Sequence, residues 1–379
     1  MTQIDKTISN IYKEKFKYAF SNLFASKTKH TILVVDDEME NLSLLNRSLR
    51  KEFDVLTAQS GMEALELVKQ HGTNISIIIS DQKMPGMTGT EFLTQAAILY
   101  PNIIKMLLTA YTDVDAMVDG VNNCNLFQYI NKPFDLDELK LAVDQAVKAY
   151  ELTLNRNILA KDLRELFFTT VKSISSALDA KDAYTHGHSY RVTMYALILA
   201  CAMNIDDETK EQIEIAGLMH DIGKIGVPEG ILCKAGKLTN DEFDVIKQHP
   251  GMGRKILSEI NKLDDVSFWL GSHHERWDGK GYPLGLKGDE IPLPARILSV
   301  ADTYDAMTSN RSYRKGLAHS VAIEEIQKCT GAQFDPEITR IFMELEQVFY
   351  SASQEPEKYY NEYSILHKTF NKYIKADDF

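Results

Sequence analysis

The chain has 379 residues, 44% of them hydrophobic and 25% charged, so it is long enough for two globular domains with separate cores. A formal net charge of −12 argues against a general nucleic-acid-binding surface, and no apolar run is long enough to cross a membrane. Four widely spaced cysteines and the absence of an apolar segment after the N-terminal lysines predict a cytoplasmic protein without a secretory signal.

Residues 1–29 are rich in lysine, and their apolar side chains recur at helical spacing. These side chains are Ile4, Ile8, Ile11, Phe16, Ala19, Phe20 and Leu23. We expect a basic amphipathic helix that docks on its own protein or on a second copy, because an aromatic stripe usually belongs to a core. The alternative is a helix that lies on a membrane surface.

The segment 30–150 alternates strand and helix five times. The predicted strands are 31–36, 53–58, 75–81, 103–109 and 126–130, and three of them are near-continuous apolar runs. Such runs are typical of parallel strands that are covered on both faces. The pattern therefore predicts an α/β doubly wound domain with a five-stranded parallel sheet.

Acidic residues lie at the ends of two of these strands. Asp36 and Asp37 end the first strand and Asp81 ends the third, at the edge where such sheets bind ligands. Three carboxylates form an oxygen-rich site that suits Mg²⁺. Thr109 ends the fourth strand and Lys132 follows the fifth, so both reach the same edge. Mg²⁺ and the ammonium group would neutralise an incoming phosphoryl group while Asp81 attacks it.

Four strings in this segment resemble those of response-regulator receiver domains: VVDDE (34–38), SDQKMPGMTG (80–89), LLTAYTD (107–113) and YINKPF (129–134). The resemblance covers about residues 30–150. The roles it implies are phosphoacceptor for Asp81, Mg²⁺ ligand for Asp36, Asp37 and Asp81, and switch residue for Thr109, Tyr129 and Lys132. It also implies a histidine kinase or a phosphotransfer protein as the phosphodonor.

Residues 135–180 contain no proline and no glycine, which predicts one long helix that includes a linking segment at 151–180. Its apolar residues keep mostly three- and four-residue steps; they are Val143, Val147, Tyr150, Leu154, Ile158, Leu163, Phe167, Val171, Ile174 and Leu178. The spacing suits coiled-coil pairing, so we favour a homodimer over a plain strut between domains.

Beyond Asp182 helix follows helix, apart from a loop rich in glycine and proline at 278–294. This pattern predicts an all-α domain at 181–350, followed by an aromatic tail at 351–379 whose role the sequence does not indicate. No helix-turn-helix or basic face follows the first domain, so we expect no DNA binding.

The second domain carries a set of histidines and aspartates with metal-ligand chemistry. The set is His188, His220, Asp221, His249, His273, His274 and Asp302. Imidazole and carboxylate without thiolate suit Fe, Mn or Zn better than Mg or Ca. Because seven ligands exceed the need of one ion, we expect two metals that share a bridging carboxylate. Lys224, three residues after Asp221, would share its helix face and offset charge on a phosphate.

Residues 181–336 resemble the HD-GYP subgroup of the HD phosphohydrolases. The match includes HDIGKIGVPEGIL (220–232), HHERWDGKGYPLGLKGDEIPLPARILSVADTYDAMTSNRSYRKGL (273–317) and FDPEI (334–338). The family hydrolyses cyclic di-GMP at a two- or three-metal centre. The resemblance implies that the seven residues above bind the metals, that Asp221 bridges them and that Lys224 assists at the phosphate. It also implies substrate contacts from Gly281, Tyr282, Pro283, Arg311 and Arg314.

One departure concerns the third metal. Family members with three metals carry a glutamate four residues before the first ligand histidine, where this chain has Tyr184. We therefore expect a binuclear centre of Fe or Mn, with Zn as an alternative, and the linear dinucleotide pGpG as product. His186 is expected at the surface, with an extra metal ligand as the alternative.

The sequence thus predicts a cyclic di-GMP phosphodiesterase that is controlled by phosphorylation of Asp81. Two alternatives stay open. One is a catalytically weak receptor that signals through protein contacts, and the other is a phosphodiesterase for a hybrid cyclic GMP–AMP.

Overall fold

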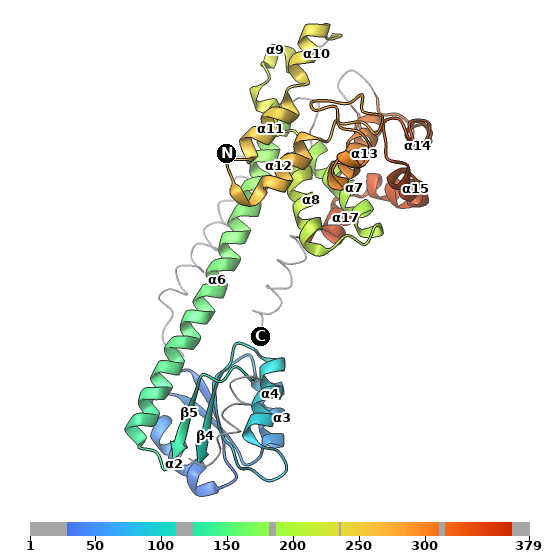
Figure 1. Ribbon diagram of the computed structural model, residues 1–379. Helices are drawn as coiled ribbons and strands as arrows, with labels where there is room; N and C mark the ends of the chain where they lie inside the picture. The colour runs from blue at the N-terminus through green and yellow to red at the C-terminus, as the bar shows by residue number, and fades with distance from the viewer. Residues whose placement is uncertain (1–28, 111–123, 182–186, 235, 311–314, 366–379) are drawn as a thin grey trace, which may run out of the picture. The chain divides into compact units, whose positions relative to one another are not determined.

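The computed structural model describes residues 29–110, 124–181, 187–234, 236–310 and 315–365 (Figure 1). The predicted N-terminal helix lies outside these residues, as do Tyr184, His186, Arg311 and Arg314. The described residues divide into two compact units, with the boundary between Lys161 and Asp162. None of the helices in these ranges has the length and apolar composition needed to span a membrane.

The first unit is a five-stranded parallel sheet with the strand order β2-β1-β3-β4-β5. The strands are β1 (Thr31–Val35), β2 (Asp54–Ala58), β3 (Ile75–Asp81), β4 (Ile104–Ala110) and β5 (Gln128–Lys132). Helix α2 (Met39–Leu49) and the start of α6 (Leu136–Lys181) cover one face, while α3 (Gly61–His71) and α4 (Gly89–Leu99) cover the other. The predicted doubly wound α/β sheet is confirmed.

Alternating side chains of β1 supply the two cores: Leu33 packs with α3 and α4, and Val34 packs with α2 and α6. The central strand β3 is buried along all of its residues. Strand β5 begins two residues later than predicted, at Gln128, and ends at Lys132. The apolar pattern missed this shift because β5 is an edge strand with a polar end.

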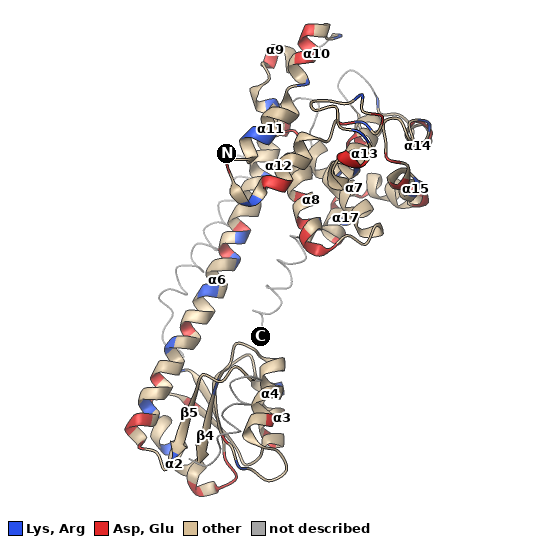
Figure 2. Ribbon diagram, viewed as in Figure 1, with Lys and Arg blue, Asp and Glu red and all other residues tan. Residues whose placement is uncertain are grey.

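Helix α6 is continuous over 46 residues, which confirms the predicted long helix. Its first turns join the core of the first unit through Val143, and its last turns join the core of the second through Val171; Leu178 is buried as well. The middle of the predicted stripe is exposed, as at Leu154 and Ile158, and so is Ile174 near its end. Basic and acidic residues are interspersed along this helix (Figure 2).

The second unit is all-α, as predicted. Its helices are α7 (His188–Ala202), α8 (Asp207–Met219), α9 (Glu229–Leu232), α10 (Asn240–Ile246), α11 (His249–Leu257), α12 (Asp264–Gly271), α13 (Leu293–Thr308), α14 (His319–Lys328), α15 (Pro336–Glu344), α16 (Glu346–Gln354) and α17 (Pro356–Tyr363). Short 3₁₀ turns lie at η1 (Ile222–Gly226), η2 (Asn261–Leu263) and η3 (Gly288–Glu290). Helix α7 is central, because it packs against α8, α13 and α17 and buries eleven of its residues.

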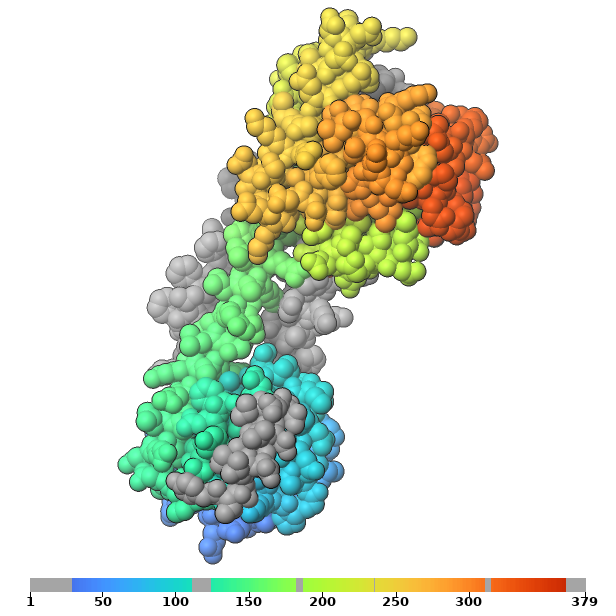
Figure 3. Space-filling model, in the orientation of Figure 1, coloured from blue at the N-terminus to red at the C-terminus, as the bar shows by residue number. Residues whose placement is uncertain are grey.

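The helical unit continues past residue 350, where the sequence analysis placed its end. Phe349 and Tyr360 are fully buried in the same core as α7. The carboxylate of Glu214, in α8, accepts hydrogen bonds from the Tyr360 hydroxyl (2.7 Å) and the Ile365 N–H (3.0 Å). Tyr360 also stacks on Tyr190 of α7, with 4.0 Å between ring centroids. In Figure 3, the residues of α13 adjoin those of the helices that follow it.

Candidate metal and phosphoacceptor sites

The carboxyl edge of the sheet brings together two carboxylates and one ammonium group. Asp36 follows β1 and Asp81 ends β3, while Lys132 ends β5. The Lys132 Nζ donates to Asp36 Oδ2 at 2.9 Å and lies 2.6 Å from Asp81 Oδ1. Asp36 is fully buried, and its Oδ1 also accepts from the Glu38 N–H at 2.9 Å.

The pKa values of Asp81 and Lys132 at this edge depend on burial and on their contact with each other. Burial raises the pKa of Asp81 by more than the contact with Lys132 lowers it. For Lys132, burial acts to lower the pKa, but hydrogen bonds to Asp81 and Asp36 raise it overall. Lys132 is therefore a cation held between two carboxylates, which is the arrangement that an arriving phosphoryl group needs.

The other residues predicted for this edge differ in exposure. Asp37 is exposed beside Asp36, where a solvated metal ion could reach it. Thr109 is buried next to the end of β4, and Tyr129 on β5 is 44% exposed. The structure therefore joins Asp36, Asp81 and Lys132 directly and places Tyr129 at the surface.

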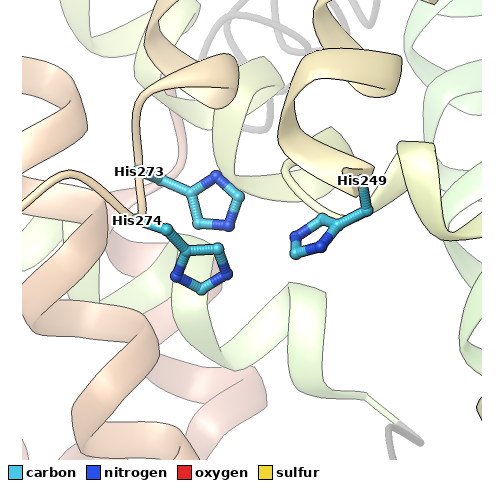
Figure 4. A group of neighbouring side chains, drawn as sticks. All are labelled: His249, His273 and His274. Atoms are coloured by element: carbon cyan, nitrogen blue, oxygen red, sulfur yellow. The ribbon is translucent and has the colours of Figure 1, made fainter. Parts of the chain in front are cut away.

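In the second unit, all seven predicted metal ligands lie in one cluster. His188 begins α7, His220 and Asp221 follow α8, His249 begins α11, His273 and His274 follow α12, and Asp302 lies in α13. Three groups have ligand atoms within 4.8 Å of one another: His249 with His273 and His274; His188 with His220 and Asp302; His220 with Asp221 and His273. Figure 4 shows the rings of the first group turned toward one another.

Three of these histidines have an imidazole nitrogen that needs a partner. In His220, His249 and His273 the Nδ1 contacts the backbone carbonyl three residues earlier, at 2.7 Å for the first two. This contact fixes the ring and leaves Nε2 facing the cluster. The three Nε2 atoms are buried, and no hydrogen-bond partner for them occurs in the described ranges. Because such atoms are costly, a cation in the cluster would satisfy all three.

Asp221 lies between the histidine groups. Its Oδ2 is 3.4 Å from His220 Nε2 and its Oδ1 is 3.4 Å from His249 Nε2. Burial alone would raise the pKa of Asp221, but Lys224 and His220 hold it well below the usual range. One ionised carboxylate therefore faces both groups, as a bridging ligand would.

Lys224 contacts the same carboxylate, with Nζ 2.7 Å from Asp221 Oδ2. The predicted helix around it is wrong in one respect: α8 stops at Met219, and Lys224 belongs to the 3₁₀ turn η1. With three residues per turn, side chains three apart align in such a turn. Lys224 therefore pairs with Asp221 as expected, but within a 3₁₀ turn and not on the face of an α-helix.

The protonation of the histidines follows from their surroundings. Burial lowers the pKa of His274 to about 4 and that of His273 well below its usual value. Both rings are therefore neutral, which is the form that binds metals. For His188, burial acts to lower the pKa, but contacts with Asp302 and Asp305 raise it to about 10. Its Nε2 lies 3.3 Å from Asp302 and 3.7 Å from Asp221, so negative charge surrounds this atom and favours a cation beside it.

Asp305 was not singled out from the sequence. Its buried carboxylate accepts from His188 Nδ1 at 2.7 Å and from Arg191 Nε at 2.6 Å. A carboxylate behind a ligand histidine orients the ring and raises its basicity. The available signal was spacing, because Asp305 lies one helical turn after Asp302 in α13.

The loop with Gly281, Tyr282 and Pro283 adjoins the cluster. A side chain at Gly281 would overlap with neighbouring backbone, and the Tyr282 ring lies 5.0 Å from that of His274. Glu275, which the sequence analysis missed, is buried and accepts from the N–H groups of residues 284, 285 and 286 at 2.6, 3.1 and 3.1 Å. Its position next to His274 was the one available signal. The loop is thus held against the metal ligands.

A pocket of about 370 Å³ opens beside this loop. His274 and Tyr282 line it on the side of the cluster, and Lys247, Arg276 and Lys280 add three cationic side chains beside the carboxylate of Glu275. Lys247 pairs with Asp244 and Arg276 with Asp278, each at 2.8 Å. A pocket with that charge suits an anionic ligand. The predicted contacts Arg311 and Arg314 lie outside the described residues.

Two family models match the chain: the response regulator receiver domain at residues 32–144 and the HD domain at residues 172–338. Fold and sites thus define a response regulator with an HD output domain. The chain is 33% identical over 337 residues to a cyclic di-GMP phosphodiesterase of Thermotoga maritima, covering 83% of this chain and 90% of the relative. It belongs to the receiver–HD family that includes this enzyme.

Two further relatives bear on activity. The cyclic di-GMP phosphodiesterase response regulator RpfG of Xanthomonas campestris is 30% identical over 350 residues, which cover 86% of this chain and 92% of the relative. The 3'3'-cGAMP-specific phosphodiesterase 3 of Vibrio cholerae is 37% identical over 167 residues, which cover 44% of this chain and 36% of that protein.

Proposed function

We propose that the HD unit hydrolyses cyclic di-GMP to pGpG at a binuclear metal centre. The observation that carries this proposal is a set of three buried Nε2 atoms, without a hydrogen-bond partner among the described residues, around the ionised carboxylate of Asp221. Full-length relatives named as cyclic di-GMP phosphodiesterases support the substrate.

The ligands divide into two groups around a shared carboxylate. His188, His220 and Asp302 would hold one divalent ion, and His249, His273 and His274 the other, with Asp221 between them. Fe and Mn suit this donor set best, with Zn as an alternative. When bound, such ions polarise a phosphoryl oxygen and lower the pKa of water toward neutrality. We infer two metals and not three because Tyr184 occupies the position where three-metal members of the family carry a glutamate.

The remaining residues bind and orient the substrate. The Lys224 ammonium group lies beside Asp221, where it can stabilise charge on the reacting phosphate or the leaving oxygen. Lys247, Arg276 and Lys280 supply positive charge in the pocket, and Gly281, Tyr282 and Pro283 hold the substrate close to His274. Arg311 and Arg314 are proposed as further phosphate or guanine contacts.

The test is hydrolysis of cyclic di-GMP by protein purified without oxygen, with metal content measured on the same sample. Turnover with about two metals per chain is expected. Tight nucleotide binding without product under Fe²⁺, Mn²⁺ and Zn²⁺ would instead identify a receptor. Because one relative is specific for 3'3'-cGAMP, the hybrid dinucleotide belongs in the same assay. If the hybrid dinucleotide is cleaved preferentially, it is the substrate in place of cyclic di-GMP.

The receiver would control this activity. We infer that Asp81 accepts a phosphoryl group from a histidine kinase or a phosphotransfer protein, with Mg²⁺ held by Asp36, Asp37 and Asp81. Lys132 already contacts two of these carboxylates, and Thr109 and Tyr129 would change position on phosphorylation. None of the four cysteines forms a disulfide in the described part of the chain, which agrees with a cytoplasmic location, where such donors act.

We also propose a homodimer that pairs through α6. Leu152, Leu159 and Leu166 recur every seven residues and are 71%, 69% and 64% exposed, and Leu163 (65%) lies between them. Heptad-spaced leucines of this kind form coiled-coil seams. This stripe shares Leu163 with the one predicted from the sequence, which also includes Val143 and Val171, buried in the cores of the two units.

The double substitution Leu159→Glu and Leu166→Glu is expected to convert the dimer to a monomer, because it places like charges in the seam. Sedimentation velocity measures the change. Leu154→Glu is the matched control, because Leu154 is exposed on the opposite face of α6, two residues from Leu152. A dimer that survives the double substitution would exclude this seam.

A further inference from the structure

The C-terminal end of α6 is attached to the elements that carry the metal ligands. Asp179, which is 8% exposed, accepts a hydrogen bond from the Ser189 hydroxyl at 3.0 Å. Ser189 is fully buried in α7, next to His188. The end of α6 is therefore fixed to the helix that begins with a proposed ligand.

Lys181, the last residue of α6, extends from this fixed point to the turn η1. Its Nζ donates to the carbonyl oxygens of Ile225 (2.9 Å) and Val227 (3.4 Å). The Val227 N–H in turn donates to the Lys224 carbonyl at 3.0 Å. Two consecutive hydrogen bonds therefore connect the Lys181 ammonium group with the backbone of Lys224.

The opposite side of η1 is in tight contact with α11. A side chain at Gly223 would overlap with the His249 carbonyl, and one at Gly226 would overlap with the Met252 side chain. The turn thus lies between α11 and the Lys181 ammonium group. Since Ile225 is 58% exposed, packing of its side chain contributes little to the position of the turn. Among the described residues, the hydrogen bonds between this turn and α6 are the two from Lys181.

We propose that Lys181 is a positioning residue that holds the Lys224 turn in register with Asp221. This inference rests on the proposed function, because it assigns Lys181 a role in that reaction. Helix α6 begins at Leu136, in the receiver unit. A shift of this helix would therefore reach the turn that carries Lys224 through the hydrogen bonds of Lys181.

The experiment compares Lys181→Met, Lys181→Arg and Lys148→Met in the full chain. Methionine keeps the apolar stem but removes the donor, arginine keeps a donor, and Lys148 is an exposed lysine of the same helix. Lys181→Met is expected to lower kcat roughly 10-fold, less than the roughly 100-fold that a misplacement of about 1 Å can cost, because only one side of the turn loses its restraint. KM and the metal content should stay unchanged, and the other two variants should retain most of kcat.

A second readout needs no substrate. Amide hydrogen exchange in residues 222–227 should accelerate in Lys181→Met, because the turn loses its restraint. If the wild-type protein does not hydrolyse the dinucleotide, the proposed function fails, and exchange still decides whether Lys181 positions the turn. Unchanged exchange in Lys181→Met would overturn the inference. So would loss of metals in that variant, because Lys181 would then support the whole centre.

Discussion

Replacing Asp221 with alanine is expected to lower turnover of cyclic di-GMP by roughly 1,000-fold, the upper range for loss of one electrostatic group in an active site. The reason is its position, with His220 and His249 each 3.4 Å from a different oxygen. Loss of the bridge should also reduce the bound metal below two ions per chain. Both quantities can be measured on one sample, by product formation and elemental analysis.

The matched control is Asp265→Ala, which removes an exposed carboxylate from the same unit. It should keep both the metal content and the turnover of the wild type. An Asp221→Ala protein that retains two metals and normal turnover would exclude a bridging role. If metal is lost from Asp221→Ala but turnover persists, the reaction does not need the binuclear centre.

Asp81→Asn is expected to abolish the response to a phosphodonor. We expect the ratio of hydrolysis rates with and without a small-molecule phosphodonor to differ from one in the wild type and to equal one in the variant. Asparagine has nearly the same shape and can still accept from the Lys132 ammonium group, which lies 2.6 Å from Asp81 in the native chain. It cannot act as the nucleophile.

Asp54→Asn provides the comparison, because Asp54 is an exposed aspartate at the start of β2. Its response should match that of the wild type. Phosphorylation can be followed independently by intact mass, which rises by one phosphoryl group in the wild type and in Asp54→Asn. A response that persists in Asp81→Asn without any added mass would show that the donor acts elsewhere.

The receiver could be predicted closely from the sequence, because its chemistry follows from its topology. Parallel strands bring their carboxyl ends to one edge, so Asp36, Asp81 and Lys132 had to meet once the strands were recognised. The error in β5 has a local cause. An edge strand with the exposed Tyr129 and a polar end has no continuous apolar signal.

The helical unit was predictable in its ligand set but not in the residues that support it. Residue types and the family resemblance identified the histidines, but Asp305 and Glu275 act through contacts with His188 and with a loop backbone. Such contacts leave no periodic pattern in the sequence. The same applies to Glu214, whose hydrogen bond to Tyr360 joins residues 146 positions apart.

That distance along the chain has a consequence for the order in which the protein forms. Helix α8, which carries Glu214 and ends beside His220, has a buried carboxylate whose described hydrogen-bond donors belong to Tyr360, Ser364 and Ile365. During synthesis the receiver emerges first and can fold as a unit. These three hydrogen bonds to Glu214 can form only after the late residues have been made. We therefore expect the newly made chain to have a folded receiver before the helical unit, with its proposed metal centre, is complete.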